Sequence, residues 1–200
     1  MANNSGVNRE SWLTELMVQL TPMIEKRDSK VPDTLRISCG FPSKKALARR
    51  GRVIGQCWYP EASASGLTQI FISPVLVEGL EVAETTLHEM VHGVVGSGHG
   101  HKGPFVQLAK KLGFTKPWTS TPSTDDLKQE LNAVLKHLGP YPHGKLEAAA
   151  MAGGGGPKQS TRLIKVACED CGCPVRMTRT RIDECGVPTC GCGGEMAEAA

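Results

Sequence analysis

The chain has 200 residues, of which 40% are hydrophobic and 22% are charged. This length and balance suit one folded domain with a smaller appended unit, and they exclude a chain that is disordered throughout. The 23 Lys and Arg residues exceed the 20 Asp and Glu residues by only three, so bulk charge alone does not indicate nucleic-acid binding. No apolar run approaches the roughly 18 residues of a membrane-spanning helix, so we expect no membrane span.

The cysteines and the start of the chain bear on the compartment. Residues 1–6 lack the basic stretch followed by an apolar stretch that directs export, so we expect a cytoplasmic protein. In the cytoplasm, clustered thiols are more often metal ligands than disulfides. Six of the eight cysteines lie between residues 168 and 192, and this clustering favours metal binding.

Hydrophobic periodicity and turn residues predict helices and strands within the first 145 residues. The expected helices cover residues 8–24, 80–95, 104–112 and 123–138, and the expected strands cover residues 34–39, 53–58 and 68–72. We therefore predict an α+β fold in which a small, mainly antiparallel sheet packs against helices.

Composition changes abruptly near residue 145. Residues 146–160 are rich in alanine and glycine, which cannot bury a core, so we expect a flexible linker there. Residues 161–200 form a unit too short to fold well without a staple such as a metal ion. The predicted organisation is a domain at 1–145, a linker at 146–160 and a metal-stabilised module at 161–200.

His88, Glu89 and His92 form the pattern His-Glu-x-x-His within the predicted helix 80–95. At about 100° and 1.5 Å per residue, positions 88 and 92 lie on one helical face, so both imidazoles can bind one ion. Zinc lowers the pKa of a water bound to it to about 7, and Glu89 would lie close enough to take that proton. The pattern predicts a catalytic zinc site with Glu89 as its catalytic base.

A catalytic zinc usually has a third protein ligand and an open fourth position. Residues 98–103 offer His99 and His101 on a glycine-rich backbone that can fold back over the helix. The metzincin spacing is missed, because Gly96 and His99 each fall one position late for it. The residues alone leave both histidines open as the third ligand.

The pattern resembles that of the SprT-like metallopeptidases, in which a Gly-His loop follows His-Glu-x-x-His and a phenylalanine comes four residues after that histidine. Gly100, His101 and Phe105 match these positions. The resemblance covers about residues 35–112, and bacteriophage-type members look most similar in size and layout. It implies a compact zinc peptidase domain with His101 as the third ligand and His99 as a solvated or neighbouring side chain.

The same resemblance implies partners. Well-known SprT-like peptidases act on proteins attached to DNA, and several members carry a C-terminal zinc ribbon. It therefore implies a protein substrate, with DNA or a DNA-bound protein as a further candidate partner. A phage-encoded member would work in the host cytoplasm.

Four cysteines in two pairs have the separation of a zinc ribbon: Cys168, Cys171, Cys190 and Cys192. The second pair is one residue shorter than Cys-x-x-Cys. We expect these thiolates to hold a structural zinc ion. Cys173 and Cys185 are left over, either as spare thiols or with Cys185 in place of Cys190 or Cys192.

A basic loop precedes the strand at 53–58, with five cations and no acid: Lys44, Lys45, Arg49, Arg50 and Arg52. Such a run is often only a solvated loop, but phosphate contact uses clusters of this kind through counterion release. We interpret these residues as candidate nucleic-acid contacts.

Together these patterns predict a zinc-dependent endopeptidase with one catalytic and one structural zinc ion. One alternative is a non-catalytic zinc-binding module for DNA binding or assembly, against which the intact Glu89 argues. The other is a peptidase that matures phage or host proteins without DNA, which would lack salt-sensitive DNA affinity.

Overall fold

A computed structural model of the chain describes residues 7–27, 29–48, 50–147 and 163–199. The chain divides into two compact units, Met1–Met151 and Ala152–Ala200. Most of the predicted linker, residues 148–160, lies outside the described residues. No helix among the described residues is long and apolar enough to cross a membrane.

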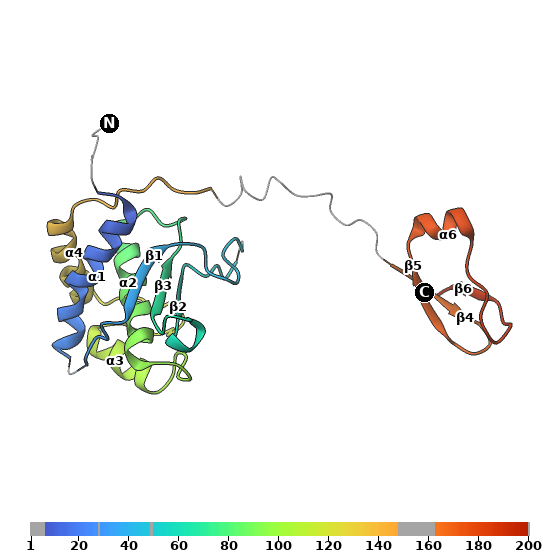
Figure 1. The fold of residues 1–200 in the computed structure, drawn as a ribbon, viewed down its shortest axis with the longest axis horizontal. Coiled ribbons are helices and arrows are strands. Elements are labelled where there is room, and N and C mark those ends of the chain that lie inside the picture. Colours follow the sequence, from blue (N-terminus) through green and yellow to red (C-terminus); the bar gives the residue numbers. More distant parts are fainter. Residues whose placement is uncertain (1–6, 28, 49, 148–162, 200) are drawn as a thin grey trace. The chain divides into compact units, whose positions relative to one another are not determined.

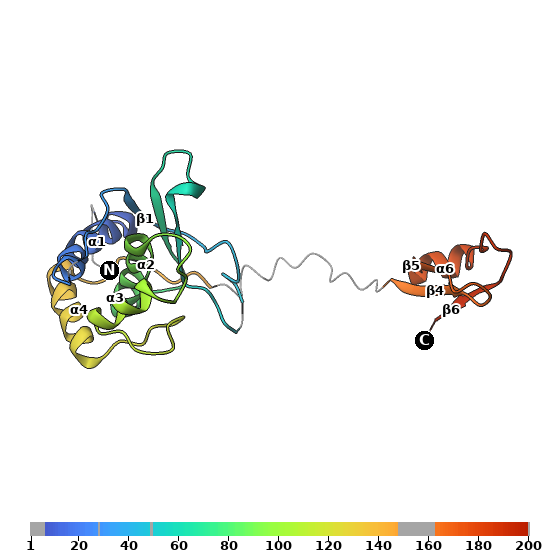
Figure 2. The ribbon, with the colours of Figure 1, turned by 90° about the horizontal axis from the view of Figure 1, so that it is seen from below.

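The described part of the N-terminal unit has helices on one side of a three-stranded sheet (Figure 1 and Figure 2). The helices are α1 (Arg9–Glu25), α2 (Gly79–Val95), α3 (Pro104–Leu112) and α4 (Asp125–Leu138). The strands are β1 (Leu35–Cys39), β2 (Gly55–Trp58) and β3 (Thr68–Ile72), and the short 3-10 helix η1 (Pro60–Ala62) lies between β2 and β3. This mixed architecture confirms the predicted α+β class.

The prediction of a mainly antiparallel sheet is wrong. The strand order is β1-β3-β2, and β3 pairs antiparallel with β2 but parallel with β1. Residues 59–67 simply return the chain from β2 to β3, whereas residues 40–54 carry it from β1 to the opposite edge of the sheet before β2 begins. Alternation of apolar and polar residues predicts a strand but not its partner. This strand order places β2 at one edge of the sheet.

Helix α2 is the central element of this unit. It contacts α1, α3, α4 and the strands β2 and β3. Ten of its 17 residues are buried, and its apolar residues Leu87, Met90 and Val91 are fully buried in the core. Because burial of each such side chain contributes about 1.5–3 kcal/mol, the packing holds α2 firmly in place. Any polar residue on its remaining face is therefore held in a fixed position.

Local signals set the ends of the helices around α2. Pro104 occupies the first turn of α3, where its missing N–H costs nothing, and Gly113 ends that helix in the left-handed conformation with φ 97°. Thr124 caps α4, because its side chain accepts a hydrogen bond from the backbone N–H of Leu127. These signals explain why the sequence predicts α3 and α4 to within two residues.

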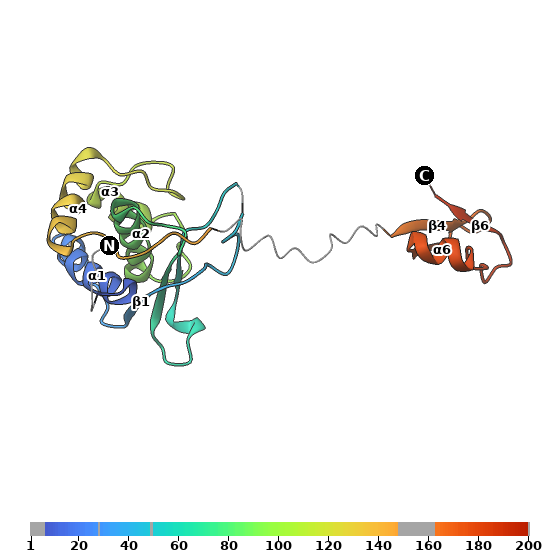
Figure 3. The same cartoon turned by 90° about the horizontal axis from the view of Figure 1, so that it is seen from above.

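The C-terminal unit is a small three-stranded sheet with one helix (Figure 3). Its strands β4 (Ile164–Cys168), β5 (Pro174–Met177) and β6 (Met196–Glu198) pair antiparallel in the order β5-β4-β6. Helix α6 (Arg179–Cys185) packs Ile182 against the core, although the sequence predicted neither α6 nor β6. Elements this short carry too few residues to show a period.

Candidate functional site

Helix α2 and the loop that follows it bring His88, His92 and His101 together. The Nε2 atom of His101 lies 3.1 Å from Nε2 of His88 and 3.2 Å from Nε2 of His92. Imidazoles bound to a tetrahedral ion at about 2.0–2.1 Å place their nitrogens roughly 3.3 Å apart, so these three atoms fit around one ion. The three histidines form a group that could hold a metal ion.

The loop after α2 places the third histidine. Gly96 ends α2 with φ 81°, and Gly100, directly before His101, has φ 50°. Because glycine adopts these positive φ values without the steric cost that a side chain adds, the loop can fold back over the helix. His99 is exposed and lies outside the histidine group, so the structure places His101 and not His99 beside the other two.

Phe105 forms the apolar wall behind the histidines. It is fully buried, and its ring centroid lies 4.4 to 5.0 Å from the centroids of all three imidazoles. An aromatic ring in this position limits rotation of the imidazoles and keeps water from one side of the site. The phenylalanine that the sequence pattern singled out is thus part of the site itself.

The three imidazoles are held in the neutral form. Burial, with smaller contributions from the neighbouring imidazoles of His92 and His101, lowers the pKa of His88 to about 3. Burial, with a contribution from His101, lowers the pKa of His92 to about 4, and burial also lowers the pKa of His101. Since only a neutral imidazole has a free lone pair for a metal, all three are ready to bind one near neutral pH.

Glu89 lies buried between α2 and β2. Its carboxylate is packed against Gly55, where an added Cβ would come within 2.5 Å of Oε1, and it accepts a hydrogen bond from the backbone N–H of Cys57. Burial raises the pKa of Glu89 to about 8, although the Cys57 hydrogen bond lowers it. A carboxyl group with this pKa can both take and release a proton near neutral pH.

The outer ring nitrogens of the two helical histidines have hydroxyl partners. Oγ1 of Thr121 lies 2.7 Å from Nδ1 of His88, and the hydroxyl of Tyr59 lies 3.4 Å from Nδ1 of His92. Sequence reasoning missed both residues, because each lies 33 positions from its histidine and belongs to no recognisable pattern. Only the fold brings them to the site.

The histidines and Glu89 line a cleft of about 590 Å³. One wall is the edge strand β2 with the preceding residues 51–54, and the other contains residues 119–121. The volume lies within the range of about 300–1,000 Å³ that is typical of ligand sites. The cleft therefore combines a possible metal group, a buried carboxylate and room for a substrate.

The basic loop borders this cleft. Arg52 lines it, and Lys44, Lys45 and Arg50 are exposed nearby in the sequence, whereas Arg49 lies outside the described residues. Within the described part of the chain, none of these four cations forms a salt bridge, although Arg52 donates a hydrogen bond to the carbonyl of Ala48. Within the described residues, no acidic side chain thus neutralises the positive charge of the loop through a salt bridge.

The four paired cysteines meet in the C-terminal unit. Sγ of Cys168 lies 3.5 Å from Sγ of Cys192, and Sγ of Cys171 lies 3.5 Å from Sγ of Cys190. The four form a group that could hold a metal ion, whereas Cys173 and Cys185 are exposed and lie outside it. The cysteine group and the histidine group together support two metal sites, without showing which metal binds.

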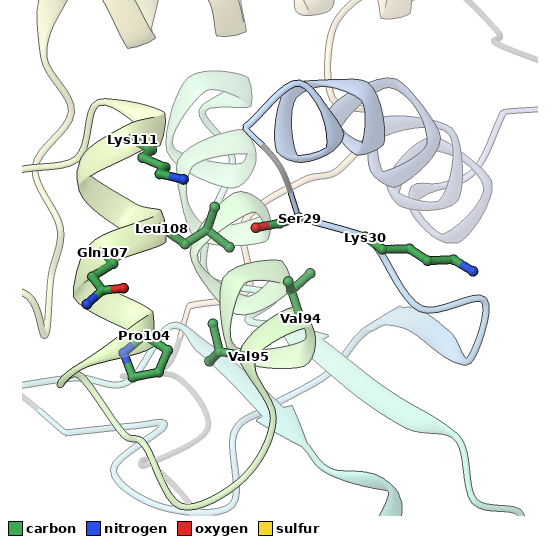
Figure 4. Close-up of a pocket in the computed structure, with 8 residues that line it drawn as sticks. All are labelled: Ser29, Lys30, Val94, Val95, Pro104, Gln107, Leu108 and Lys111. Atoms are coloured by element: carbon green, nitrogen blue, oxygen red, sulfur yellow. The ribbon is translucent and has the colours of Figure 1, made fainter.

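A second cavity in the N-terminal unit lies between the end of α2, helix α3 and residues 29–30 (Figure 4). It measures about 330 Å³. Its lining residues are Ser29, Lys30, Val94, Val95, Pro104, Gln107, Leu108 and Lys111. None of these is a histidine, cysteine or acid, so this cavity offers no metal ligand of these types.

Comparison with protein-family models, with curated proteins and with solved structures finds no match to this chain. The likeness to SprT-like metallopeptidases thus depends on residues 88–105 and on the resemblance in the tail. This likeness stays a prediction, and the function proposed below depends on the geometry of the cleft.

Proposed function

We propose that the N-terminal unit is a zinc-dependent endopeptidase of the SprT-like type. The observation that carries the proposal is the convergence of three neutral imidazoles from His88, His92 and His101, with Glu89 beside them in an open cleft. The donor set supports zinc in particular, because imidazole nitrogens at this spacing suit a tetrahedral ion.

The number of ligands favours a catalytic over a structural ion. Structural zinc sites have four protein ligands, whereas catalytic sites have three and keep one position open. Within the described residues, the group around His101 contains three histidines and no fourth ligand. This supports the peptidase over the alternative of a zinc-stabilised assembly module.

A zinc ion held here would polarise the scissile carbonyl and lower the pKa of a coordinated water. Glu89 would accept the proton of the attacking water and deliver it to the leaving amine. Its carboxylate is held for this by the Cys57 N–H and by the close packing of Gly55. Among the described strands, β2 has β3 as its one neighbour, so an extended peptide could pair with the backbone of β2 where it lines the cleft, apart from the Cys57 N–H that bonds to Glu89.

The basic loop favours substrates associated with nucleic acid. Its four described cations lie without salt bridges in the segment that runs into the cleft wall at residues 51–54. Phosphates bound there would gain from counterion release, and a protein attached to DNA would be brought to the histidine group.

The proposal is tested by a cleavage assay. We expect the full chain loaded with zinc to cut a denatured protein, to lose the activity with a zinc chelator and to regain it when zinc is restored. Single-stranded DNA should increase cleavage of a DNA-binding substrate at low salt and lose this effect at high salt. A zinc-loaded chain that cuts neither substrate would favour the assembly module, and cleavage indifferent to DNA would favour the maturation peptidase.

A further inference from the structure

Thr121 has an unusual backbone for its residue type. Its φ is 39°, in the left-handed region that β-branched residues rarely adopt, and the residue is only 4% exposed. Such a conformation persists when the surrounding structure imposes it, and it often marks a functional constraint. We therefore looked for the cause of this conformation in the contacts that the Thr121 side chain makes.

The loop around Thr121 is fixed by its own hydrogen bonds. Phe114 and Ser123 form an isolated antiparallel bridge, and the N–H of Thr115 donates to the carbonyl of Pro122 at 2.8 Å. The N–H of Thr121 itself donates to the carbonyl of Pro117, also at 2.8 Å. These bonds close the loop independently of the histidines, so the loop can hold its hydroxyl in place for them.

This backbone conformation places Oγ1 of Thr121 2.7 Å from Nδ1 of His88. Nε2 of the same ring faces Nε2 of His101, on the side where an ion would lie. A ligand must present a lone pair at Nε2, so Nδ1 must carry the proton and needs an acceptor. Among the described residues, Oγ1 of Thr121 is the partner that the structure gives to Nδ1.

We propose that Thr121 is a positioning residue of the metal site: its hydroxyl oxygen accepts a hydrogen bond from Nδ1–H of His88 and so fixes the tautomer and ring orientation that bind the ion. The proposal rests on the proposed function, because it assumes that the histidine group holds a metal. The strained backbone is what aims the hydroxyl at the ring. Since the partner is a neutral hydroxyl and not a carboxylate, it adds no negative charge to the site.

Three substitutions in the full chain separate this role from a merely structural one. Thr121→Val keeps the shape and removes the hydroxyl, and Thr121→Ser keeps the hydroxyl. Thr119→Val is the matched control, because Thr119 lines the same cleft wall but is exposed. Cobalt(II) serves as the probe. Only the cysteine site gives sulfur-to-cobalt charge-transfer absorption, so binding at the histidine site can be followed separately.

We expect Thr121→Val to weaken cobalt binding at the histidine site by about 10- to 100-fold, as for other partners of metal-bound histidines. Thr121→Ser should restore most of the affinity, and Thr119→Val should leave it unchanged. In ¹⁵N-labelled chain without metal, the His88 ring should be the Nδ1–H tautomer in wild type and lose this preference in Thr121→Val.

Equal affinity and an unchanged tautomer in Thr121→Val would overturn the proposal, as would a loss of affinity that Thr121→Ser does not restore. If the wild-type histidines bind no cobalt or zinc, the proposed function fails instead. The tautomer measurement then still decides whether Thr121 orients His88, because it needs no metal and no cleavage.

Discussion

Replacing Glu89 with glutamine is expected to abolish peptide cleavage while both metal sites stay filled. Glutamine has nearly the same shape and can still accept the Cys57 hydrogen bond, but it cannot take a proton from water. Loss of a general base typically costs about 10²- to 10⁴-fold in rate. The measurement is the cleavage rate of a denatured protein by the zinc-loaded chain, together with its zinc content.

Glu84→Gln is the matched control for this variant. Glu84 lies on the same helix, does not line the cleft and is outside the histidine group. The Glu84→Gln variant should cleave the substrate at the wild-type rate. Unchanged cleavage by Glu89→Gln would refute the assigned role of Glu89, and loss of zinc from that variant would mean that the carboxylate helps to hold the metal.

The second large effect concerns the C-terminal unit. Substituting Cys168 and Cys171 together by serine should unfold this unit and leave the N-terminal unit folded with its metal. Among the described residues of this unit, the buried core consists of Val166, Cys168, Cys190 and Met196, and two of these four, Cys168 and Cys190, also belong to the metal group. Structural zinc contributes about 10–16 kcal/mol of apparent binding free energy in small domains, far more than this core can supply.

An amide ¹H–¹⁵N spectrum of the full chain measures this effect directly. The signals of residues 163–199 should collapse to unfolded positions, whereas those of the N-terminal unit should not move. Substituting Cys173 and Cys185 by serine is the control, because both thiols are exposed and lie outside the group. A double variant of Cys168 and Cys171 that keeps a dispersed spectrum would show that the unit folds without its metal.

Patterns that repeat within one element were readable from the sequence. The spacing of apolar residues in α2 was enough to place His88, Glu89 and His92 on one side of a helix, and the structure gives that helix as Gly79–Val95. Pro104 and Gly113 marked the ends of α3 because each acts through its own backbone. Such signals depend only on neighbouring residues, so no knowledge of the fold was needed.

Features that depend on contacts between distant segments were not readable. The parallel pairing of β1 with β3 depends on how residues 40–54 cross the sheet, which strand patterns do not encode. Thr121 and Tyr59 reach the histidines only through the folded loops that carry them. The choice of His101 over His99 came from the family resemblance, and the structure shows its physical cause in the glycine turn before residue 101.

We expect His101 to complete a metal site with His88 and His92, and the zinc content of two matched variants of the full chain measures whether it does. His99 and His101 lie two residues apart in one glycine-rich loop, so each can be replaced by alanine with little risk to the core. We predict two zinc ions per chain for wild type and for His99→Ala, and one for His101→Ala. Two zinc ions in His101→Ala, or the loss of one in His99→Ala, would mean that His101 is not the third ligand of this site.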